Sequence, residues 1–156
     1  MLQVLILCHG NICRSPLAEV LLEAAVAADP ELAGRVSVSS AGTSNEHEGE
    51  GMHANSAALL ALRGMRTEHR ARRLTPALAA RQDLILVADR FNLRDGRAVA
   101  AATVQKPTVQ LLRDFDPQAP GEDLDDPWSY PMEAYERAAA EILSAIPGIL
   151  MDLKTR

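Results

Sequence analysis

The chain has 156 residues, carries a formal net charge of −5 at pH 7, and is 47% hydrophobic but only 3% aromatic. This length suits one domain of ordinary size, so we expect a single domain over residues 1–156 with a core of Leu, Val, Ile and Ala. The acidic balance argues against a nucleic acid as partner. No apolar run reaches the roughly 20 residues that cross a membrane, and the N-terminus lacks a basic region with a cleavage site. The sequence therefore predicts a cytoplasmic protein with no membrane partner.

A strand, a loop and a helix are expected at the N-terminus. Residues 4–7, Val-Leu-Ile-Leu, are typical of a strand buried on both faces of a parallel sheet. Apolar residues recur at helical spacing from Leu17, after Ser15 and Pro16, which suit an N-cap and a first helical turn. The N–H groups at a helix start lack partners within the helix, and the helix dipole adds partial positive charge. The loop therefore predicts a binding site for an anion such as phosphate.

Two reactive residue types frame this loop. Cys8 closes the predicted strand, and Arg14 follows in the run Cys-His-Gly-Asn-Ile-Cys-Arg-Ser-Pro, which lacks the Gly-Lys-Ser/Thr ending of a nucleotide P-loop. A cysteine among N–H donors, near a guanidinium and a helix N-terminus, is expected to be a thiolate and hence a nucleophile. Arg14 can hold two phosphate oxygens with its planar fork. The alternative is an inert, buried cysteine beside a surface arginine.

The rest of the chain alternates predicted strands with predicted helices. Further strands are expected at residues 36–40, before a turn at 41–43, and at 83–87 and 108–112. Helices are expected at residues 54–63, from Thr75-Pro76 onward, at 91–102, and from 132 onward, where Pro147 and Gly148 bend or end the last helix. This alternation predicts an α/β fold, a four-stranded parallel sheet with helices on both faces. The loop at residues 43–51 is then expected to rim the ligand site.

Residues 117–131 contain four prolines and several acids, so they predict a long irregular loop. Long loops in compact domains are often functional. A carboxylic acid here could protonate a leaving oxygen, and the resulting carboxylate could activate water. Asp126 is the expected acid because Pro127 restricts its backbone and Trp128 can stack on a substrate ring. Asp125 is the fallback, and a merely solvated acidic loop is the alternative.

The run from Cys8 to Pro16 resembles the C-x5-R-S-P signature of the low-molecular-weight protein tyrosine phosphatases. Further segments match the family's order and approximate spacing, at Ser40-Ala41-Gly42-Thr43, His69-Arg70-Ala71-Arg72, Asp83-Leu84-Ile85-Leu86 and Asp126-Pro127-Trp128. The resemblance covers nearly the whole chain. It implies a doubly wound, flavodoxin-like fold and hydrolysis of a phosphotyrosyl protein or an aryl phosphate through a phosphocysteine. It also implies no metal and no cofactor, and it suggests a bacterial tyrosine kinase as one substrate protein.

The loop residues are expected to have distinct roles in this reaction. Phosphate oxygens would be bound by the Arg14 side chain and by the backbone N–H groups of His9, Gly10, Asn11, Ile12, Cys13 and Arg14. Ser15 would donate a hydrogen bond to Cys8, and Asn11, which tolerates a left-handed conformation, would stabilise the tight turn. The resemblance implies that His69 supports the loop through Asn11.

Two loop residues keep alternative interpretations. Cys13 either forms a reversible disulfide with Cys8 after oxidation or merely fills space in the loop. His9, where the family commonly has a small or apolar residue, either adds positive charge beside the thiolate or points to solvent, and we favour solvent.

Two further positions depart from the family pattern. Glu46 stands where much of the family has an aromatic or large apolar residue beside the substrate ring, and Ser129 stands where many members have a second tyrosine. Glu46 is either a solvated loop charge or a substrate-binding residue that faces the mouth of the site and repels acidic substrates. These departures leave room for a phosphoester other than phosphotyrosine.

Two other functions remain open. Arsenate reductases of related fold share a similar anion loop, but the thioredoxin-coupled type needs further cysteines, and this chain has only Cys8 and Cys13. A binding module would hold a phosphorylated partner without turnover, and the presence of both Cys8 and Asp126 argues against it. We therefore predict phosphomonoester hydrolysis by Cys8, Arg14 and Asp126.

Overall fold

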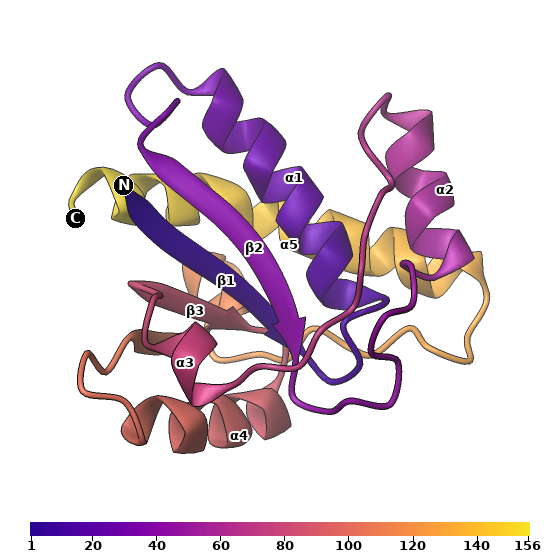
Figure 1. Ribbon diagram of the computed structural model, residues 1–156. Coiled ribbons are helices and arrows are strands. Elements are labelled where there is room, and N and C mark those ends of the chain that lie inside the picture. The colour runs from indigo at the N-terminus through magenta and orange to yellow at the C-terminus, as the bar shows by residue number, and fades with distance from the viewer.

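The computed structural model describes residues 1–156 and contains one sheet of four strands, namely β1 (Leu2–Cys8), β2 (Val36–Gly42), β3 (Leu84–Val87) and β4 (Thr108–Leu111). All neighbouring strands are parallel, and their order is β2-β1-β3-β4 (Figure 1). Cys8 at the end of β1 lies opposite Gly42 of β2, and Leu7 lies opposite Val87 of β3. The predicted four-stranded parallel sheet is confirmed.

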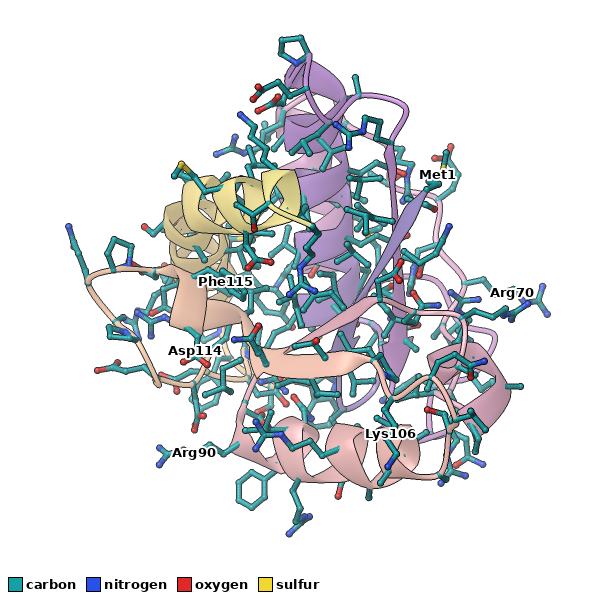
Figure 2. All side chains as sticks on the ribbon, turned by 90° about the vertical axis from the view of Figure 1, so that its left-hand side faces the viewer. Met1, Arg70, Arg90, Lys106, Asp114 and Phe115 are labelled. Carbon is teal, nitrogen blue, oxygen red and sulfur yellow. The ribbon has the colours of Figure 1, made fainter.

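Helices cover both faces of the sheet, as expected for a doubly wound fold (Figure 1). One face carries α1 (Arg14–Ala28) and α5 (Met132–Lys154), and the other carries α3 (Pro76–Ala79) and α4 (Arg90–Ala101). The remaining helices are α2 (Ala54–Leu62), which packs against α1 and α5, and the 3-10 helix η1 (Leu112–Phe115), which packs against α5. Figure 2 shows α4 and α5 on opposite sides of β4, with Arg70 and Arg90 extending outward. No helix combines the length and the apolar character that crossing a membrane requires.

The β1 strand shows why its sequence is an uninterrupted apolar run. Val4 and Ile6 pack with α1 and α5, whereas Leu5 and Leu7 pack with α3 and α4. Successive side chains of a strand point to opposite faces, so a strand covered on both sides needs apolar residues at every position. These four side chains are at most 1% exposed. Burial of this strand holds its last residue, Cys8, at a fixed point on the carboxyl edge of the sheet.

Two expectations around this edge were wrong. Helix α1 begins at Arg14 with Cys13 as its N-cap residue, and no side chain caps it. The Ser15 hydroxyl is not available for capping because it lies between Cys8 and Asn11. The second strand also continues to Gly42, two residues into the turn expected at residues 41–43, and Gly42 exchanges backbone hydrogen bonds with residues 72 and 74.

The last helix does not end at Pro147 and Gly148, since α5 continues to Lys154. Proline removes one hydrogen-bond donor from the helix interior, but the packed apolar face of α5 outweighs this loss. Gly148 has a packing role instead. A Cβ atom at Gly148 would lie 2.1 Å from the carbonyl oxygen of Phe115, so only glycine allows η1 to approach α5 this closely.

Candidate active site

The site lies at the carboxyl edge of the sheet, where the loop of residues 9–13 connects β1 to α1 (Figure 1). Open α/β sheets bind their ligands at this edge because the strand-to-helix loops meet there. A cavity of about 270 Å³ opens at the loop, lined by Cys8, His9, Gly10, Ile12, Cys13, Arg14, Glu46, His47, Asp126 and Trp128. Of the predicted site residues, Asn11, Ser15 and His69 do not line this cavity.

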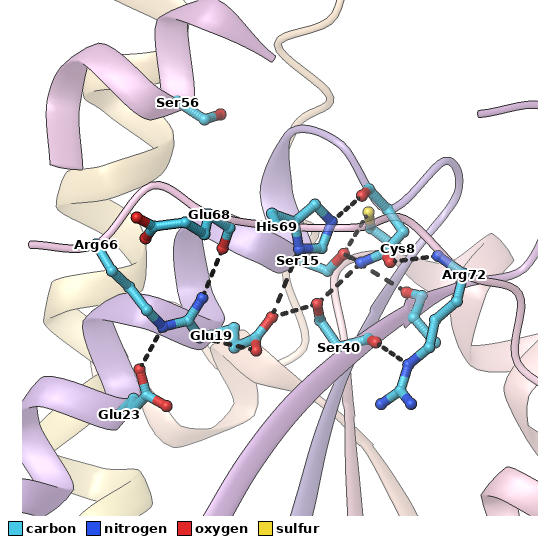
Figure 3. Close-up of polar contacts among 12 residues, drawn as sticks. Cys8, Ser15, Glu19, Glu23, Ser40, Ser56, Arg66, Glu68, His69 and Arg72 are labelled. Carbon is cyan, nitrogen blue, oxygen red and sulfur yellow. Dashed lines mark hydrogen bonds and ion pairs between the residues drawn. The ribbon is translucent and has the colours of Figure 1, made fainter. Parts of the chain in front are cut away.

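Asn11 holds the loop in its conformation through hydrogen bonds with Ser15, Ser40 and Arg72, three residues that are labelled in Figure 3. Its φ is 58°, a left-handed value that asparagine tolerates better than most residues. The Asn11 amide donates to Ser15 Oγ at 2.8 Å and to Ser40 Oγ at 2.9 Å, and its Oδ1 accepts from the Arg72 N–H at 2.9 Å. His69 Nε2 lies 2.6 Å from the Asn11 carbonyl oxygen and must donate to it, because a carbonyl only accepts. These contacts join the loop to β2 and to residues 69–72.

Cys8 is 3% exposed, and its Sγ lies 3.0 Å from Ser15 Oγ. Ser15 Oγ already accepts a hydrogen bond from Asn11, so its own proton is free for another partner. The Cys8 sulfur is closer to this hydroxyl than the Ala41 carbonyl oxygen, which lies 3.5 Å away. The geometry therefore lets Ser15 donate to Cys8, an interaction that stabilises a negatively charged sulfur.

Arg14 is 3% exposed and is held in one orientation by three oxygen atoms. Its Nη1 donates to Asp89 Oδ2 at 2.8 Å and to the Leu124 carbonyl oxygen at 2.7 Å, and its Nη2 lies 3.7 Å from Asp126 Oδ2. Burial by itself would lower the pKa of Arg14, but the negative charges of Cys8, Asp126 and Asp89 together raise it above its ordinary value. The guanidinium is therefore a fixed positive charge beside the loop.

Asp89 is a contact of the site that the sequence reasoning missed. It follows β3, and it is also the N-cap residue of α4, where Oδ1 accepts from the Asn92 N–H at 2.9 Å. The Asp89 carboxylate thus caps the N-terminus of α4 with one oxygen and orients Arg14 with the other. Its position in the sequence could have indicated this contact, since an aspartate two residues after a buried parallel strand lies at the same edge of the sheet as Cys8.

Asp126 lines the cavity with a half-exposed carboxylate, and its Oδ1 accepts from the Trp128 N–H at 3.1 Å. The neighbouring acids lie elsewhere. Asp125 lines only a second cavity on the α5 side, to which Asp126 also contributes, and Asp123 accepts from the Arg90 N–H at 3.0 Å. Asp126 is therefore the acid of this loop that can reach a ligand bound beside Cys8.

The part of the cavity rim near residues 46 and 47 carries charged and imidazole side chains, whereas Trp128 lines another part. Glu46 Oε1 lies 3.5 Å from His9 Nε2, and both side chains are more than half exposed. His47, which the sequence reasoning did not name, has its Nδ1 2.6 Å from Glu50 Oε2. A Cβ atom at Gly10 would lie 3.0 Å from the His47 ring, so glycine allows the ring to rest on the loop. Glu46 thus lies at the mouth of the cavity, and His9 lines the same mouth while remaining open to solvent.

Cys13 differs from Cys8 in its surroundings. Its side chain is buried in an apolar cluster with Ile12, Ala71 and Tyr135, and its Sγ lies 3.5 Å from the Tyr135 hydroxyl. Burial raises the pKa of Cys13 to about 11, although the hydrogen bond with Tyr135 opposes this shift. Cys13 is therefore a neutral thiol near neutral pH. Both cysteines are free in the structure, and a disulfide between them after oxidation stays a prediction.

The fold and the site together define a class of protein. One loop and its cavity bring together a cysteine sulfur with a hydrogen-bond donor, an arginine held in one orientation, and an aspartate that lines the same cavity. This arrangement is typical of cysteine-dependent phosphatases. No three His, Cys, Asp or Glu side chains are grouped so that they could hold a metal ion.

Comparisons with known proteins give the family. The model of the family described as low molecular weight phosphotyrosine protein phosphatase matches residues 3–156. A low molecular weight protein-tyrosine-phosphatase of Streptomyces coelicolor is 37% identical over 150 residues, which are 95% of this chain and 91% of the relative. This chain belongs to the low molecular weight phosphotyrosine protein phosphatase family. It is a cysteine-dependent phosphatase, and neither arsenate reduction nor mere binding is favoured.

Solved structures agree with this fold. A protein tyrosine phosphatase from Entamoeba histolytica superposes with a TM-score of 0.90 at 22% identity, covering 99% of this chain and 98% of the other. A Drosophila arginine phosphatase superposes with a TM-score of 0.85 at 27% identity, covering 96% of each chain. The two neighbours share the fold, yet their names specify different phosphorylated residues.

Proposed function

We propose that this chain is a cytoplasmic enzyme that hydrolyses phosphotyrosyl groups on proteins, a bacterial tyrosine kinase among them. The observation that carries the proposal is the arrangement of Cys8, Arg14 and Asp126 around one cavity. Ile12 and Trp128 in the same lining supply apolar and aromatic surface that suits a phenyl ring. The name of the Streptomyces relative also supports phosphotyrosine as the substrate group.

In the first step, the Cys8 thiolate attacks phosphorus in line with the bond to the tyrosyl oxygen. The S–P bond forms as the P–O bond breaks, and Asp126 transfers its proton to the departing oxygen. The backbone N–H groups of residues 9–14 and the Arg14 guanidinium hold the three equatorial oxygens of the phosphoryl group. Asp89 and the Leu124 carbonyl contribute by fixing the plane of Arg14.

In the second step, the Asp126 carboxylate takes a proton from a water molecule, whose oxygen attacks phosphorus. The S–P bond breaks, inorganic phosphate leaves, and Cys8 departs as a thiolate. The Ser15 hydroxyl, 3.0 Å from the sulfur, donates a hydrogen bond that stabilises this leaving group. Asp126 thus serves as acid and then as base.

Substrate preference tests the proposal directly. We expect kcat/KM for a phosphotyrosyl peptide to exceed that for the same peptide with phosphoserine or phosphoarginine by about two- to tenfold, because ring stacking contributes about 0.5–1.5 kcal/mol beyond burial. The measurement is phosphate release from the three peptides under identical conditions. A phosphoarginine peptide that is hydrolysed equally well would contradict the tyrosine assignment while leaving the phosphocysteine chemistry intact.

The rim residue Glu46 is expected to select against acidic substrates. Its carboxylate lies at the cavity mouth, so replacing it with tryptophan removes a negative charge from the approach path. We expect Glu46→Trp to raise kcat/KM about two- to fivefold for phosphotyrosyl peptides with acidic neighbours, relative to neutral ones, because exposed charge pairs contribute only about 0.2–1 kcal/mol.

The control for this prediction is Glu48→Gln, on the same loop but in the lining of a different cavity. Peptide selectivity is measured at low and high salt, since the effect of an exposed charge weakens with ionic strength. Unchanged selectivity in Glu46→Trp would show that Glu46 is only a solvated loop charge.

A further inference from the structure

The loop that carries Asp126 is attached to the rest of the protein at few points. Within residues 120–126, one hydrogen bond between backbone groups joins the loop to another part of the chain, from the Leu124 N–H to the Ala88 carbonyl oxygen at 2.8 Å. The Leu124 carbonyl oxygen accepts from Arg14 at 2.7 Å. Because the loop has so few backbone hydrogen bonds, its position depends on side chains that reach it from outside.

Arg113 of η1 provides one of these side-chain contacts. Its side chain is 12% exposed, and its Nη1 donates to the Asp123 carbonyl oxygen at 3.1 Å. The same nitrogen lies 3.5 Å from Glu122 Oε2 and 3.9 Å from Glu141 Oε1 of α5. The Arg113 Nε is buried without a hydrogen-bond partner, which lowers stability, and a well-packed apolar side chain would avoid this loss. Stability alone therefore does not explain an arginine at this position.

Arg113 holds one end of a peptide group whose other end is also held. The Asp123 carbonyl and the Leu124 N–H belong to the same planar peptide group. The carbonyl accepts from Arg113, and the N–H donates to Ala88, so the orientation of this plane is fixed at both ends. The chain then leaves the plane in a defined direction. Asp126 follows Leu124 by two residues, so fixing the plane limits where its carboxylate can lie.

We propose that Arg113 is a positioning residue for Asp126, because fixing this peptide group holds the acid beside the catalytic cavity. The inference rests on the proposed function, in which Asp126 protonates the leaving oxygen. Arg113 does not line the cavity and touches no reacting atom. Arg14 depends less on the loop, because Asp89 also holds its guanidinium, at 2.8 Å. Loss of Arg113 is therefore expected to impair proton transfer more than phosphate binding.

The test compares two aryl phosphates in Arg113→Met. We expect kcat/KM to fall about tenfold for phenyl phosphate and about twofold or less for p-nitrophenyl phosphate, because a displaced acid impairs the departure of the more basic oxygen most. The inhibition constant of inorganic phosphate is expected to stay within about twofold of the wild-type value, since the loop N–H groups and Arg14 remain. A contact that only stabilises the fold would lower both rates equally.

Matched variants separate the contacts of Arg113. Glu122→Gln and Glu141→Gln remove its carboxylate partners but leave its hydrogen bond to the Asp123 carbonyl, so both are expected to match the wild type. Arg113→Lys can still donate to that carbonyl and is expected to recover most of the loss. The double variant of Arg113→Met with Glu141→Gln leaves no half-buried carboxylate without its cation, so it decides the question if Arg113→Met alone does not fold.

A double-mutant cycle with Asp126→Asn tests whether Arg113 acts through the acid. Two residues that act through one function have losses that do not add. When the acid is already absent, Arg113→Met is therefore expected to cost about twofold or less on phenyl phosphate. A loss of about tenfold in both backgrounds would overturn the proposal, because Arg113 would then contribute independently of Asp126.

The same series separates the two proposals. If Asp126→Asn loses activity equally on both esters, the acid assignment of the proposed function fails. If Asp126→Asn loses more on phenyl phosphate while Arg113→Met treats the two esters as the wild type does, only the role of Arg113 is overturned. A selective loss on phenyl phosphate in Glu141→Gln would also overturn it, since the contact with α5 would then position the acid.

Discussion

Replacement of Cys8 by serine is expected to lower kcat for p-nitrophenyl phosphate by at least about 10⁴-fold, the scale seen when a nucleophile is removed from an enzyme. A serine hydroxyl is not ionised at neutral pH, so it cannot attack phosphorus as a thiolate does. Phosphate binding is expected to remain, because the loop N–H groups and Arg14 are unchanged. Steady-state kinetics and phosphate-binding calorimetry measure the two properties separately.

The control for this prediction is Cys13→Ser, because Cys13 is a buried neutral thiol that bonds to Tyr135. It is expected to keep most of the activity. Acid quenching during turnover of p-nitrophenyl phosphate, whose good leaving group makes the first step fast, is expected to trap a phosphoryl group on Cys8 in the wild type and in Cys13→Ser. Mass spectrometry that finds turnover without this phosphopeptide would contradict the two-step mechanism.

Asp126→Asn is expected to lower kcat/KM in proportion to how poorly the leaving group departs. A positioned acid contributes about 10²–10⁴-fold, and its contribution is largest when the leaving oxygen is most basic. We therefore expect a loss of about 10³-fold on phenyl phosphate and of only about tenfold on p-nitrophenyl phosphate. A plot of log(kcat/KM) against leaving-group pKa for a series of aryl phosphates gives the result.

Asp125→Asn is the matched control, because this neighbour has the same side chain but lines the cavity on the α5 side. It is expected to match the wild type across the series. A steep leaving-group dependence in Asp125→Asn, with a flat one in Asp126→Asn, would transfer the acid role to Asp125. Equal losses on all esters in Asp126→Asn would indicate that the residue orients Arg14, which it approaches at 3.7 Å, rather than donating a proton.

The features of this protein that depend on neighbouring residues in the chain were predictable from local sequence pattern. The apolar run of β1, the loop and the start of α1 are contiguous, so strand, anion-binding loop, Cys8 and Arg14 were all predictable from local pattern. The position of Asp126 was predictable for the same reason, because Pro127 and Trp128 follow it directly in the sequence. The alternation of strands and helices was sufficient for the fold class.

Sequence pattern was less reliable where a local structural preference competes with a contact made in the folded protein. Ser15 has the right type and place for an N-cap, yet its hydroxyl bonds to Cys8 and Asn11. Pro147 and Gly148 are typical helix breakers, yet α5 continues because its apolar face is buried. Gly148 is also the residue against which the Phe115 carbonyl oxygen packs. In both cases a contact from another element outweighs the local preference.

The contacts of Arg14 with residues far along the chain depend on the packed fold. Asp89 lies 75 positions from Arg14 in the sequence, and Leu124 lies 110 positions from it. No periodicity or motif connects such residues, because their meeting depends on the order of the strands and on where the loops after β3 and before α5 lie. The placement of the proposed reactive groups and the supporting contacts of Ser15 and His69 were therefore predictable from the sequence and the family resemblance, whereas the contacts that orient Arg14 required the packed fold.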